Sequence, residues 1–533
     1  MTDSMFLNGG NYVLNLDAAI NFPEILDIEK NAPICDCLII PIGVYNSRLR
    51  VWEDEDSDRG FVAIELACYL MNITNKSALK GTGENCYFEY TYKGGNRIIL
   101  DPQNRDGNSQ SSGEHTIGCA KFWDATIITS KSSLIIDAKS RGVKAYFLSP
   151  EIYSGFRQVI MPTDLLSLWQ KKSDAISASD WASCFSDQAP LVPNEFVEFV
   201  YPEGESTGNY ENIGMFNPTT EKLEHLKYFN CGRVPHNVTP KNARQAMAFE
   251  AAFAGPERDL PCVIFYGAAG CGKTFISLTA AISQTDLRHN SGNLDRIEQT
   301  YQGNLTKKRS KKQRAKEEVY AQAQLEYEAE ISAEDEARNT SKELTKERRR
   351  LSDATPIYDQ IWCCPPDRMM GDKIGAVPGD RWAKLRDYLD GFSQNIQALL
   401  KTIKDKKKNG EEMTGRDIQL RAESIMRSIN FTSPGQLNGD SFTDTFFLLD
   451  EAEFMKEAQI RTAIERIAEG SKIIISGDPR QTRNPYGWYG NPLARVIRRL
   501  EGDKEVAILR FEGEQTQRKG AGIIYRNYYQ VAA

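Results

Sequence analysis

The stretch CVIFYGAAGCGKTFISLTAAI, residues 262–282, decides the fold of the second half of this 533-residue chain. Its apolar start is typical of a buried strand, its centre of a glycine-rich loop, and its end of a helix. That order is the context in which GxxxxGK[ST] forms a phosphate-binding loop. The loop residues expected around a bound triphosphate are Gly267, Ala268, Ala269, Gly270, Cys271, Gly272, Lys273 and Thr274.

The residue types in this loop predict their roles. Gly267, Gly270 and Gly272 let the backbone approach the phosphates closely, and the helix that follows directs its amide end at them. Lys273 is expected to reach the β- and γ-phosphates, and Thr274 to hold Mg²⁺.

A second apolar strand, in TFFLLDEAEF (445–454), ends in acidic residues. It places Asp450 and Glu451 at its carboxyl end, where open α/β sheets bind ligands. We expect Asp450 to bind Mg²⁺ through water and Glu451 to orient or deprotonate the attacking water. The alternative is an acidic helix start that favours the helix dipole alone.

Two further segments are similar to helicase motifs. KIIISGDPRQ (472–481) resembles motif III of superfamily 1 helicases, which implies that Gln481 senses the γ-phosphate. PKNARQ (240–245) precedes the first strand, and in helicase-like proteins an Asn and a Gln at this place grip adenine. Asn242 and Gln245 are the corresponding residues, and they indicate a preference for ATP.

Together these segments resemble the PhoH family. The resemblance rests on KNARQ (241–245), GAAGCGKT (267–274), IGAVPGD (374–380), LLDEAEF (448–454), ERIAEGSKIIISGDPRQ (465–481) and FEGEQTQRKGAGII (511–524). By position Arg466 and Arg518 match arginines of the family pattern. The resemblance implies that they stabilise γ-phosphate charge, in cis or from a neighbouring subunit, although each could equally be a surface arginine. Departures from the pattern are Glu453 in place of Gln, and Cys363 and Cys364 in place of Arg-Pro.

The first half of the chain alternates short apolar strands with helical patterns, which predicts an α/β domain with a mostly parallel sheet. VLNLDAAINFPEIL (13–26), IIPIGVYNSRLR (39–50) and ATIITSKSSLIIDAKSRGV (125–143) resemble the PIN domain found in some PhoH proteins. PIN nucleases gather carboxylates around a divalent cation.

The acidic positions of that resemblance are largely lost in this chain. They fall on Asn15, on Asn46 or Ser47, near Gly113 with Glu114 beside it, and on Lys131. Asp17 is an offset acid that would face the same side as Asn15 only if the strand continued that far. We expect the PIN fold without its metal site.

The resulting fold class is α/β with three parts: a PIN-like domain at residues 1–170, a linker and small β module at 171–238, and a PhoH-type P-loop domain, similar to superfamily 1 helicases, at 239–533. A charged helical insertion at about 286–355 interrupts the last part. Its segment 304–355 holds neither Gly nor Pro, with basic KKRSKKQRAK (307–316) before acidic LEYEAEISAEDEA (325–337). A solvated face is the simpler reading, and an arm for nucleic acid or a partner the other.

Composition narrows the class of protein. The net charge of −7 argues against a uniformly basic nucleic-acid binder. Eleven cysteines without regular spacing fit a reducing cytoplasm better than a disulfide framework, and four histidines argue against a zinc site. No run of 18 apolar residues predicts a membrane span, so we expect a cytoplasmic protein without a membrane partner.

The function expected from these features is ATP hydrolysis with Mg²⁺. By resemblance the energy remodels or unwinds RNA or another single-stranded nucleic acid, as a homo-oligomer in a ring of six. Two alternatives stay open. One is a metal-dependent ribonuclease coupled to the ATPase and built from Asp17, Glu114 and other acids. The other is a non-catalytic protein that uses ATP to close an assembly.

Overall fold

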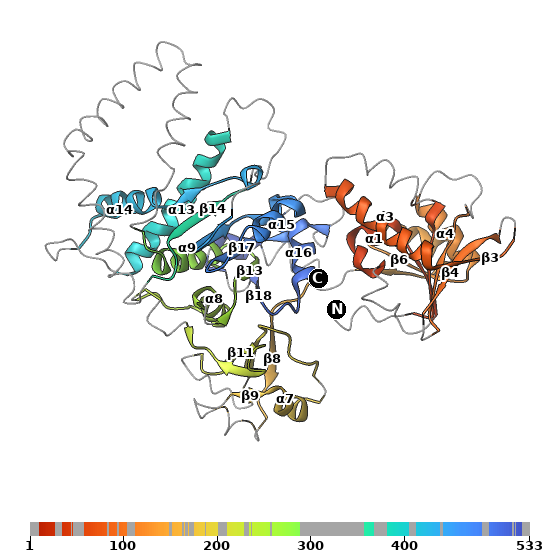
Figure 1. Ribbon diagram of the computed structural model, residues 1–533, viewed down its shortest axis with the longest axis horizontal. Coiled ribbons are helices and arrows are strands. Elements are labelled where there is room, and N and C mark those ends of the chain that lie inside the picture. Colours follow the sequence, from red (N-terminus) through yellow and green to blue (C-terminus); the bar gives the residue numbers. More distant parts are fainter. Residues whose placement is uncertain are drawn as a thin grey trace, which may run out of the picture. The chain divides into compact units, whose positions relative to one another are not determined.

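The computed structural model (Figure 1) describes residues 10–26, 35–43, 45, 58–82, 85–92, 95–103, 112–148, 152–162, 165, 169, 175–186, 188–200, 210–228, 234–235, 237–255, 258–287, 356–366, 381–403, 412–437, 441–481, 490–513, 516–517 and 519–524. The chain forms two compact units. The first comprises Met1–Tyr153, Lys456–Ala458 and Pro479–Arg499, and the second Ser154–Met455, Gln459–Asp478 and Leu500–Ala533. The helical insertion expected at about 286–355 lies outside the described residues from 288 onward.

The first unit holds a seven-stranded sheet with the order β3-β4-β5-β2-β1-β6-β7. The strands from β5 to β7 run parallel, as the alternation of strands and helices predicts, whereas β3 and β4 pair antiparallel at one edge. The strands are β1 (Asn11–Leu14), β2 (Cys37–Ile40), β3 (Ala78–Lys80), β4 (Tyr87–Thr91), β5 (Arg97–Leu100), β6 (Thr126–Thr129) and β7 (Ala145–Phe147).

Both faces of the central strands of this sheet are buried, which explains their continuous apolar runs. Val13 packs on one face together with α4 (Ser112–Phe122) and α5 (Ser132–Ser140). Leu14 packs on the other face with α1 (Leu16–Asn21) and α3 (Asp58–Lys76). Successive residues of β1 thus serve two separate cores.

The second unit contains a five-stranded sheet with the order β8-β10-β11-β12-β9. It covers the predicted small β module and also takes in β8, which lies within residues 1–170. Strand β12 begins at Lys222, directly after the turn at 218–221, and pairs antiparallel with β11. The elements are β8 (Phe156–Ile160), β9 (Ile176–Ser177), α7 (Ala178–Cys184), β10 (Phe196–Val200), β11 (Ile213–Asn217) and β12 (Lys222–His225).

The second unit also contains a six-stranded, fully parallel sheet with the order β15-β14-β16-β17-β13-β18. Its strands are β13 (Cys262–Gly267), β14 (Gln360–Cys364), β15 (Asn430–Phe431), β16 (Thr445–Leu449), β17 (Lys472–Gly477) and β18 (Val506–Phe511). The helices of this unit are α8 (Ala243–Phe253), α9 (Lys273–Gln284), α13 (Arg381–Thr402), α14 (Gly415–Arg427) and, from Gln459 onward, α15 (Glu457–Glu465). Helix α16 (Pro492–Leu500) belongs to the first unit up to Arg499.

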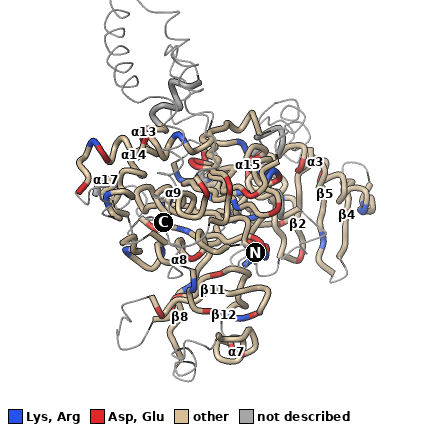
Figure 2. Tube along the Cα trace, turned by 60° about the vertical axis from the view of Figure 1, so that its left-hand side comes forward, with Lys and Arg blue, Asp and Glu red and all other residues tan. Residues whose placement is uncertain are grey.

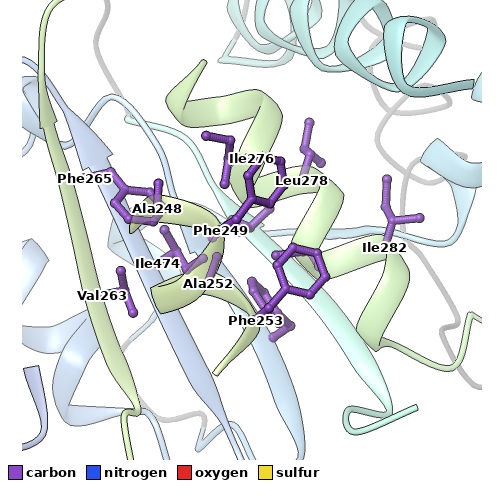
Figure 3. Close-up of a cluster of buried hydrophobic side chains, with 14 of the residues drawn as sticks. Ala248, Phe249, Ala252, Phe253, Val263, Phe265, Ile276, Leu278, Ile282 and Ile474 are labelled. Carbon is purple, nitrogen blue, oxygen red and sulfur yellow. The ribbon is translucent and has the colours of Figure 1, made fainter. Parts of the chain in front are cut away.

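Helices α8 and α9 are fixed to this sheet by a shared apolar core (Figure 3). Phe249 and Phe253 stand one turn apart on α8, and Ile276 on α9 packs in the same cluster with Ile474 of β17. A fully buried side chain of this kind stabilises the fold by about 2 kcal/mol. The core therefore fixes the positions of β13 and α9, the two elements that the phosphate-binding loop joins.

The distribution of charged residues and the hydropathy of the helices in the described chain agree with its overall composition. Figure 2 shows Lys, Arg, Asp and Glu interspersed along the described parts of the trace. Within the described ranges, the helices lack the combination of length and apolar character that crossing a bilayer requires.

Candidate nucleotide-binding site

The strand order of the parallel sheet brings the predicted site residues together. β17 lies between β13 and β16, so the residues that follow these three strands meet at one edge of the sheet. The phosphate-binding loop follows β13, Asp450 follows β16, and Ser476 is the penultimate residue of β17. This edge is the one at which parallel α/β sheets bind ligands.

The loop from Gly267 to Gly272 needs glycine at both ends. Gly267 has φ +110°, and a Cβ there would lie 2.1 Å from the backbone oxygen of Phe511. Gly272 caps α9 with φ +99°, in the left-handed region that favours glycine. Helix α9 begins at Lys273, so its free amide end faces the loop, as the sequence predicts.

Lys273 folds along this loop. Its Nζ donates to the backbone oxygens of Gly267 at 2.6 Å and Ala268 at 2.9 Å. These bonds keep the ammonium group beside the loop, where it balances negative charge at the strand ends.

Asp450 is the buried centre of the site, with a relative exposure of 6%. Thr274 Oγ1 donates to its Oδ2 at 3.1 Å, Ser476 Oγ donates to Oδ1, and the Tyr388 hydroxyl lies 3.5 Å from Oδ2. Burial raises the pKa of Asp450, while the hydrogen bonds from Ser476 and Thr274 oppose that shift. A hydroxyl and a carboxylate oxygen at this distance are donors of the type that Mg²⁺ prefers.

Sequence reasoning missed Ser476 and Tyr388 as partners of Asp450. Ser476 could have been found, because it immediately precedes the Gly-Asp of KIIISGDPRQ, on a strand predicted to end at the site. Tyr388 lies on α13 and reaches the site only through tertiary packing beside Cys363, whose Sγ is 3.3 Å from the Tyr388 hydroxyl. No local pattern marks it.

Two glutamates extend the acidic end of β16. Glu451 adopts a left-handed backbone with φ +54°, and burial followed by the charge of Asp450 raises its pKa. Glu453 is buried in η7 (Ala452–Phe454), and burial followed by the charge of Glu451 raises its pKa well above the usual value. The site therefore concentrates carboxyl groups that bind protons readily until a cation balances them.

Asn242 and Gln245 support the loop from the side of α8. The Asn242 side chain caps α8 by accepting from Gln245 N at 2.9 Å. The Gln245 amide accepts from Lys241 N at 3.0 Å and donates to the Cys271 carbonyl at 3.0 Å. The structure places Gln245 against the loop; the adenine contact expected of both residues stays a prediction.

The remaining candidates are distributed differently. Gln481 ends η8 (Pro479–Gln481), directly after β17, and its role as a γ-phosphate sensor stays a prediction. Arg466 follows α15, where its carbonyl accepts from Phe442 N, ahead of the start of β17. It therefore lies at the amino edge of the sheet, about 20 Å from the carboxyl edge for six strand residues. Arg518 lies outside the described residues.

In the first unit, Asn15 is tied into a polar network. It caps α1 by accepting from Asp17 N at 3.1 Å, and its amide donates to Thr116 Oγ1 at 3.0 Å. β1 ends at Leu14, so the strand does not continue to Asp17, which lies in α1. Lys131 precedes α5 as its N-cap residue and is exposed.

The other acids of this unit serve structural contacts. Glu114 lies on α4 with its carboxylate 3.5 Å from Arg141. Asp101, which sequence reasoning did not single out, is buried after β5 and accepts from Trp123 Nε1 at 2.7 Å and Gln103 N at 3.0 Å. Asn46 and Ser47 lie outside the described residues. Where the structure is described, no three His, Cys, Asp or Glu side chains are grouped to hold a metal ion.

Comparison with known proteins supports the resemblance to the PhoH family for residues 357–529. Residues 357–529 match the family described as PhoH-like protein. The chain is 25% identical to Protein PhoH2 of Bacillus subtilis (strain 168) over 353 residues, which are 66% of this chain and 59% of that protein. Protein PhoH of Escherichia coli (strain K12) is 25% identical over 160 residues, 30% of this chain and 41% of its own length.

A further relative is the PhoH-like protein of Synechocystis sp. (strain ATCC 27184 / PCC 6803 / Kazusa), 28% identical over 140 residues, 26% of this chain and 38% of that protein. The chain thus spans less than two thirds of the length of each of these relatives. Among solved structures, a domain of a functionally unknown protein from Methanocaldococcus jannaschii DSM 2661 covers 28% of this chain and 99% of its own, at 15% identity and a TM-score of 0.19. That score is too low to indicate a shared fold.

Proposed function

We propose that this chain, which carries a PhoH-like segment at residues 357–529, binds ATP with Mg²⁺ and hydrolyses it. The observation that carries the proposal is the distance of 3.1 Å between Thr274 Oγ1, in the helix that follows β13, and Asp450 Oδ2, directly after β16. The glycine-rich loop alone would support only anion binding. Asp450, beside the loop, supplies a place for a cation, and Glu451 supplies a base.

Each residue then has a distinct task. The loop amides and Lys273 hold the phosphates, and Thr274 and Asp450 hold Mg²⁺. Bound Mg²⁺ neutralises charge that develops on the β- and γ-phosphate oxygens. Glu451 orients the attacking water and accepts its proton, because it follows Asp450 directly and its raised pKa favours proton uptake. Ser476 keeps the Asp450 carboxylate in place by donating to Oδ1.

ATP turnover by Lys273→Ala and Glu451→Gln tests this proposal. Lys273→Ala should weaken nucleotide binding because it removes the positive partner of the phosphates. Glu451→Gln should bind ATP but lose turnover by about 100-fold or more, since a general base contributes on that order. Wild-type turnover in both variants would contradict the proposal. Binding without turnover in the wild type would favour an ATP-dependent assembly protein.

We further propose that hydrolysis drives remodelling of RNA or another single-stranded nucleic acid. The support is the resemblance to the PhoH family, together with the likeness of KIIISGDPRQ to motif III of superfamily 1 helicases. Turnover measured with and without single-stranded RNA and DNA tests it. Stimulation by one of them would identify the substrate, and equal rates in all three reactions would contradict the proposal.

A homo-oligomeric ring of six is the assembly that we propose for this activity. The number of subunits comes from the resemblance to the PhoH family. The need for a neighbouring subunit is supported by the place of Arg466 at the amino edge of the sheet, remote from the Thr274–Asp450 pair of its own chain. An arginine so placed can act on a γ-phosphate only from a neighbouring subunit. Light scattering should show a hexamer with an ATP analogue, and a monomer under all conditions would contradict the proposal.

A further inference from the structure

The phosphate-binding loop is held in place through its backbone carbonyl groups. A run of five consecutive carbonyls, from Gly267 to Cys271, is hydrogen-bonded. Lys273 Nζ donates to the first two, at Gly267 and Ala268. The other three are bonded by Thr516 Oγ1 at Ala269 (3.1 Å), Gln517 N at Gly270 (2.9 Å) and Gln245 Nε2 at Cys271 (3.0 Å).

The segment that we call the C-terminal strap, residues 512–513 and 516–517, supplies two of these hydrogen bonds. The strap continues from β18, whose last residue, Phe511, accepts from Ala268 N at 3.2 Å. Within the strap, the backbone oxygen of Glu512 accepts from Cys271 Sγ at 3.3 Å. Burial raises the pKa of Cys271 to about 11, so the sulfur keeps the proton that it donates. The strap therefore contacts the loop at Ala269, Gly270 and Cys271.

A hydrogen bond that fixes the direction of a carbonyl group also fixes the direction of the N–H group of the next residue. In a planar trans peptide, the C=O of one residue and the N–H of the next point in opposite directions. The bond from Thr516 to the Ala269 oxygen thus turns Gly270 N–H away from the strap, and the bond from Gln517 to the Gly270 oxygen does the same for Cys271 N–H. The bond from Gln245 to the Cys271 oxygen fixes the direction of Gly272 N–H in the same way. Successive amides directed together form a nest for an anion.

We propose that the C-terminal strap is a positioning element of the nucleotide site, in which the Thr516 hydroxyl and the Gln517 backbone amide aim the amides of Gly270 and Cys271 at the phosphates of ATP. The inference rests on the proposed function and adds residues that the loop motif does not contain. Since the strap acts through the phosphate nest, it contributes to binding of any polyphosphate, with or without a nucleoside.

Two matched pairs of variants test the two bonds. Thr516→Val removes the hydroxyl with little change in shape, and Thr516→Ser keeps it. Gln517→Pro removes the backbone N–H, and Gln517→Ala keeps it. The dissociation constants of ATP and of inorganic tripolyphosphate are measured for each variant by calorimetry, and thermal unfolding is recorded without ligand.

We expect Thr516→Val and Gln517→Pro to weaken binding of both ligands about threefold to tenfold, the range of one net hydrogen bond. Thr516→Ser and Gln517→Ala should bind as the wild type does. The loss of affinity in Thr516→Val should exceed any loss of turnover number at saturating ATP, because Glu451 and Asp450 are untouched.

The outcomes separate this inference from the proposed function. Lys273→Ala serves as the reference for loss of phosphate binding. If it loses binding while Thr516→Val and Gln517→Pro bind normally, the strap inference is wrong and the nucleotide site stands. If Lys273→Ala also binds normally, the proposed function fails first. Lower unfolding temperatures with unchanged affinity would show that the strap only stabilises the fold, and weakened binding of ATP but not tripolyphosphate would place its action on the nucleoside; either result overturns the inference.

Discussion

Thr274 Oγ1 lies 3.1 Å from Asp450 Oδ2, although 176 residues separate the two along the chain. Thr274 is the second residue of α9, the helix after β13, and Asp450 immediately follows the strand β16. Their contact joins the two motifs that the sequence offers separately. It also gives the site a pair of oxygen donors of different chemistry, one hydroxyl and one carboxylate.

This pair predicts that Thr274 acts through Mg²⁺. Thr274→Val should reduce the gain in ATP affinity that Mg²⁺ provides by about tenfold or more, the scale on which metal-site substitutions act. Binding measured in EDTA should change little. Thr274→Ser retains the hydroxyl and serves as the control. An equal loss of affinity with Mg²⁺ and in EDTA would show that Thr274 contacts the nucleotide without the cation.

The buried Glu453 carboxyl predicts a pH-dependent stability. Its pKa in the folded protein is raised well above the usual glutamate value of 4.5, so above pH 4.5 the unfolded chain releases this proton while the folded protein keeps it. The free energy of unfolding should therefore fall as pH rises through this window, by at most about 1.4 kcal/mol per pH unit. Glu453→Gln cannot ionise and should remove that share of the decline.

Urea unfolding of the wild type and Glu453→Gln, without nucleotide, measures this effect at about pH 5 and about pH 8. The variant should gain stability relative to the wild type at the higher pH. Glu469→Gln, at an exposed position, is the matched control. A difference between wild type and Glu453→Gln that is the same at both pH values would contradict the prediction.

The charged segment 304–355 is expected to be dispensable for the fold. The chain leaves and re-enters the described structure at adjacent points: Thr285 bridges to Tyr358, and Asp286 N donates to the Tyr358 oxygen at 2.8 Å. A short loop can therefore join these ends at small entropic cost, since loop closure depends only weakly on length. Replacing 304–355 by a Gly-Ser linker should leave ATP affinity unchanged. An insoluble product, or one that does not bind ATP, would show that the segment packs structurally.

The first unit should lack metal-dependent nuclease activity. The buried Asn15 amide already donates to Thr116 and caps α1, and the exposed Lys131 would repel a cation brought close to it. We expect no cleavage of labelled single-stranded RNA with Mg²⁺ or Mn²⁺ by the full chain, with Lys273→Ala assayed in parallel. Cleavage that disappears in Asp17→Asn or Glu114→Gln would favour the ribonuclease alternative instead.

The sequence by itself determined the local features of the nucleotide site. The glycine-rich loop and the strand that ends in Asp450 are recognisable because each needs a short run of residues with a fixed chemistry. Most strands of the first unit were predictable for the same reason, since buried parallel strands are continuous apolar runs. The α1 helix was not predictable in this way. Asn15 caps α1 directly after β1 ends, so Asp17 lies in the helix and does not extend the strand.

Only the tertiary structure decided which distant residues support the site. Tyr388 reaches Asp450 from α13, and Thr516 reaches the Ala269 carbonyl across 247 residues. The same packing leaves Arg466 at the opposite edge of the sheet from the phosphate-binding loop. These contacts depend on the order of parallel strands, which crossover connections set over long stretches of chain. A local pattern specifies a strand and the residue at which it ends. Which strands lie beside it depends on how the two faces of the whole sheet are buried.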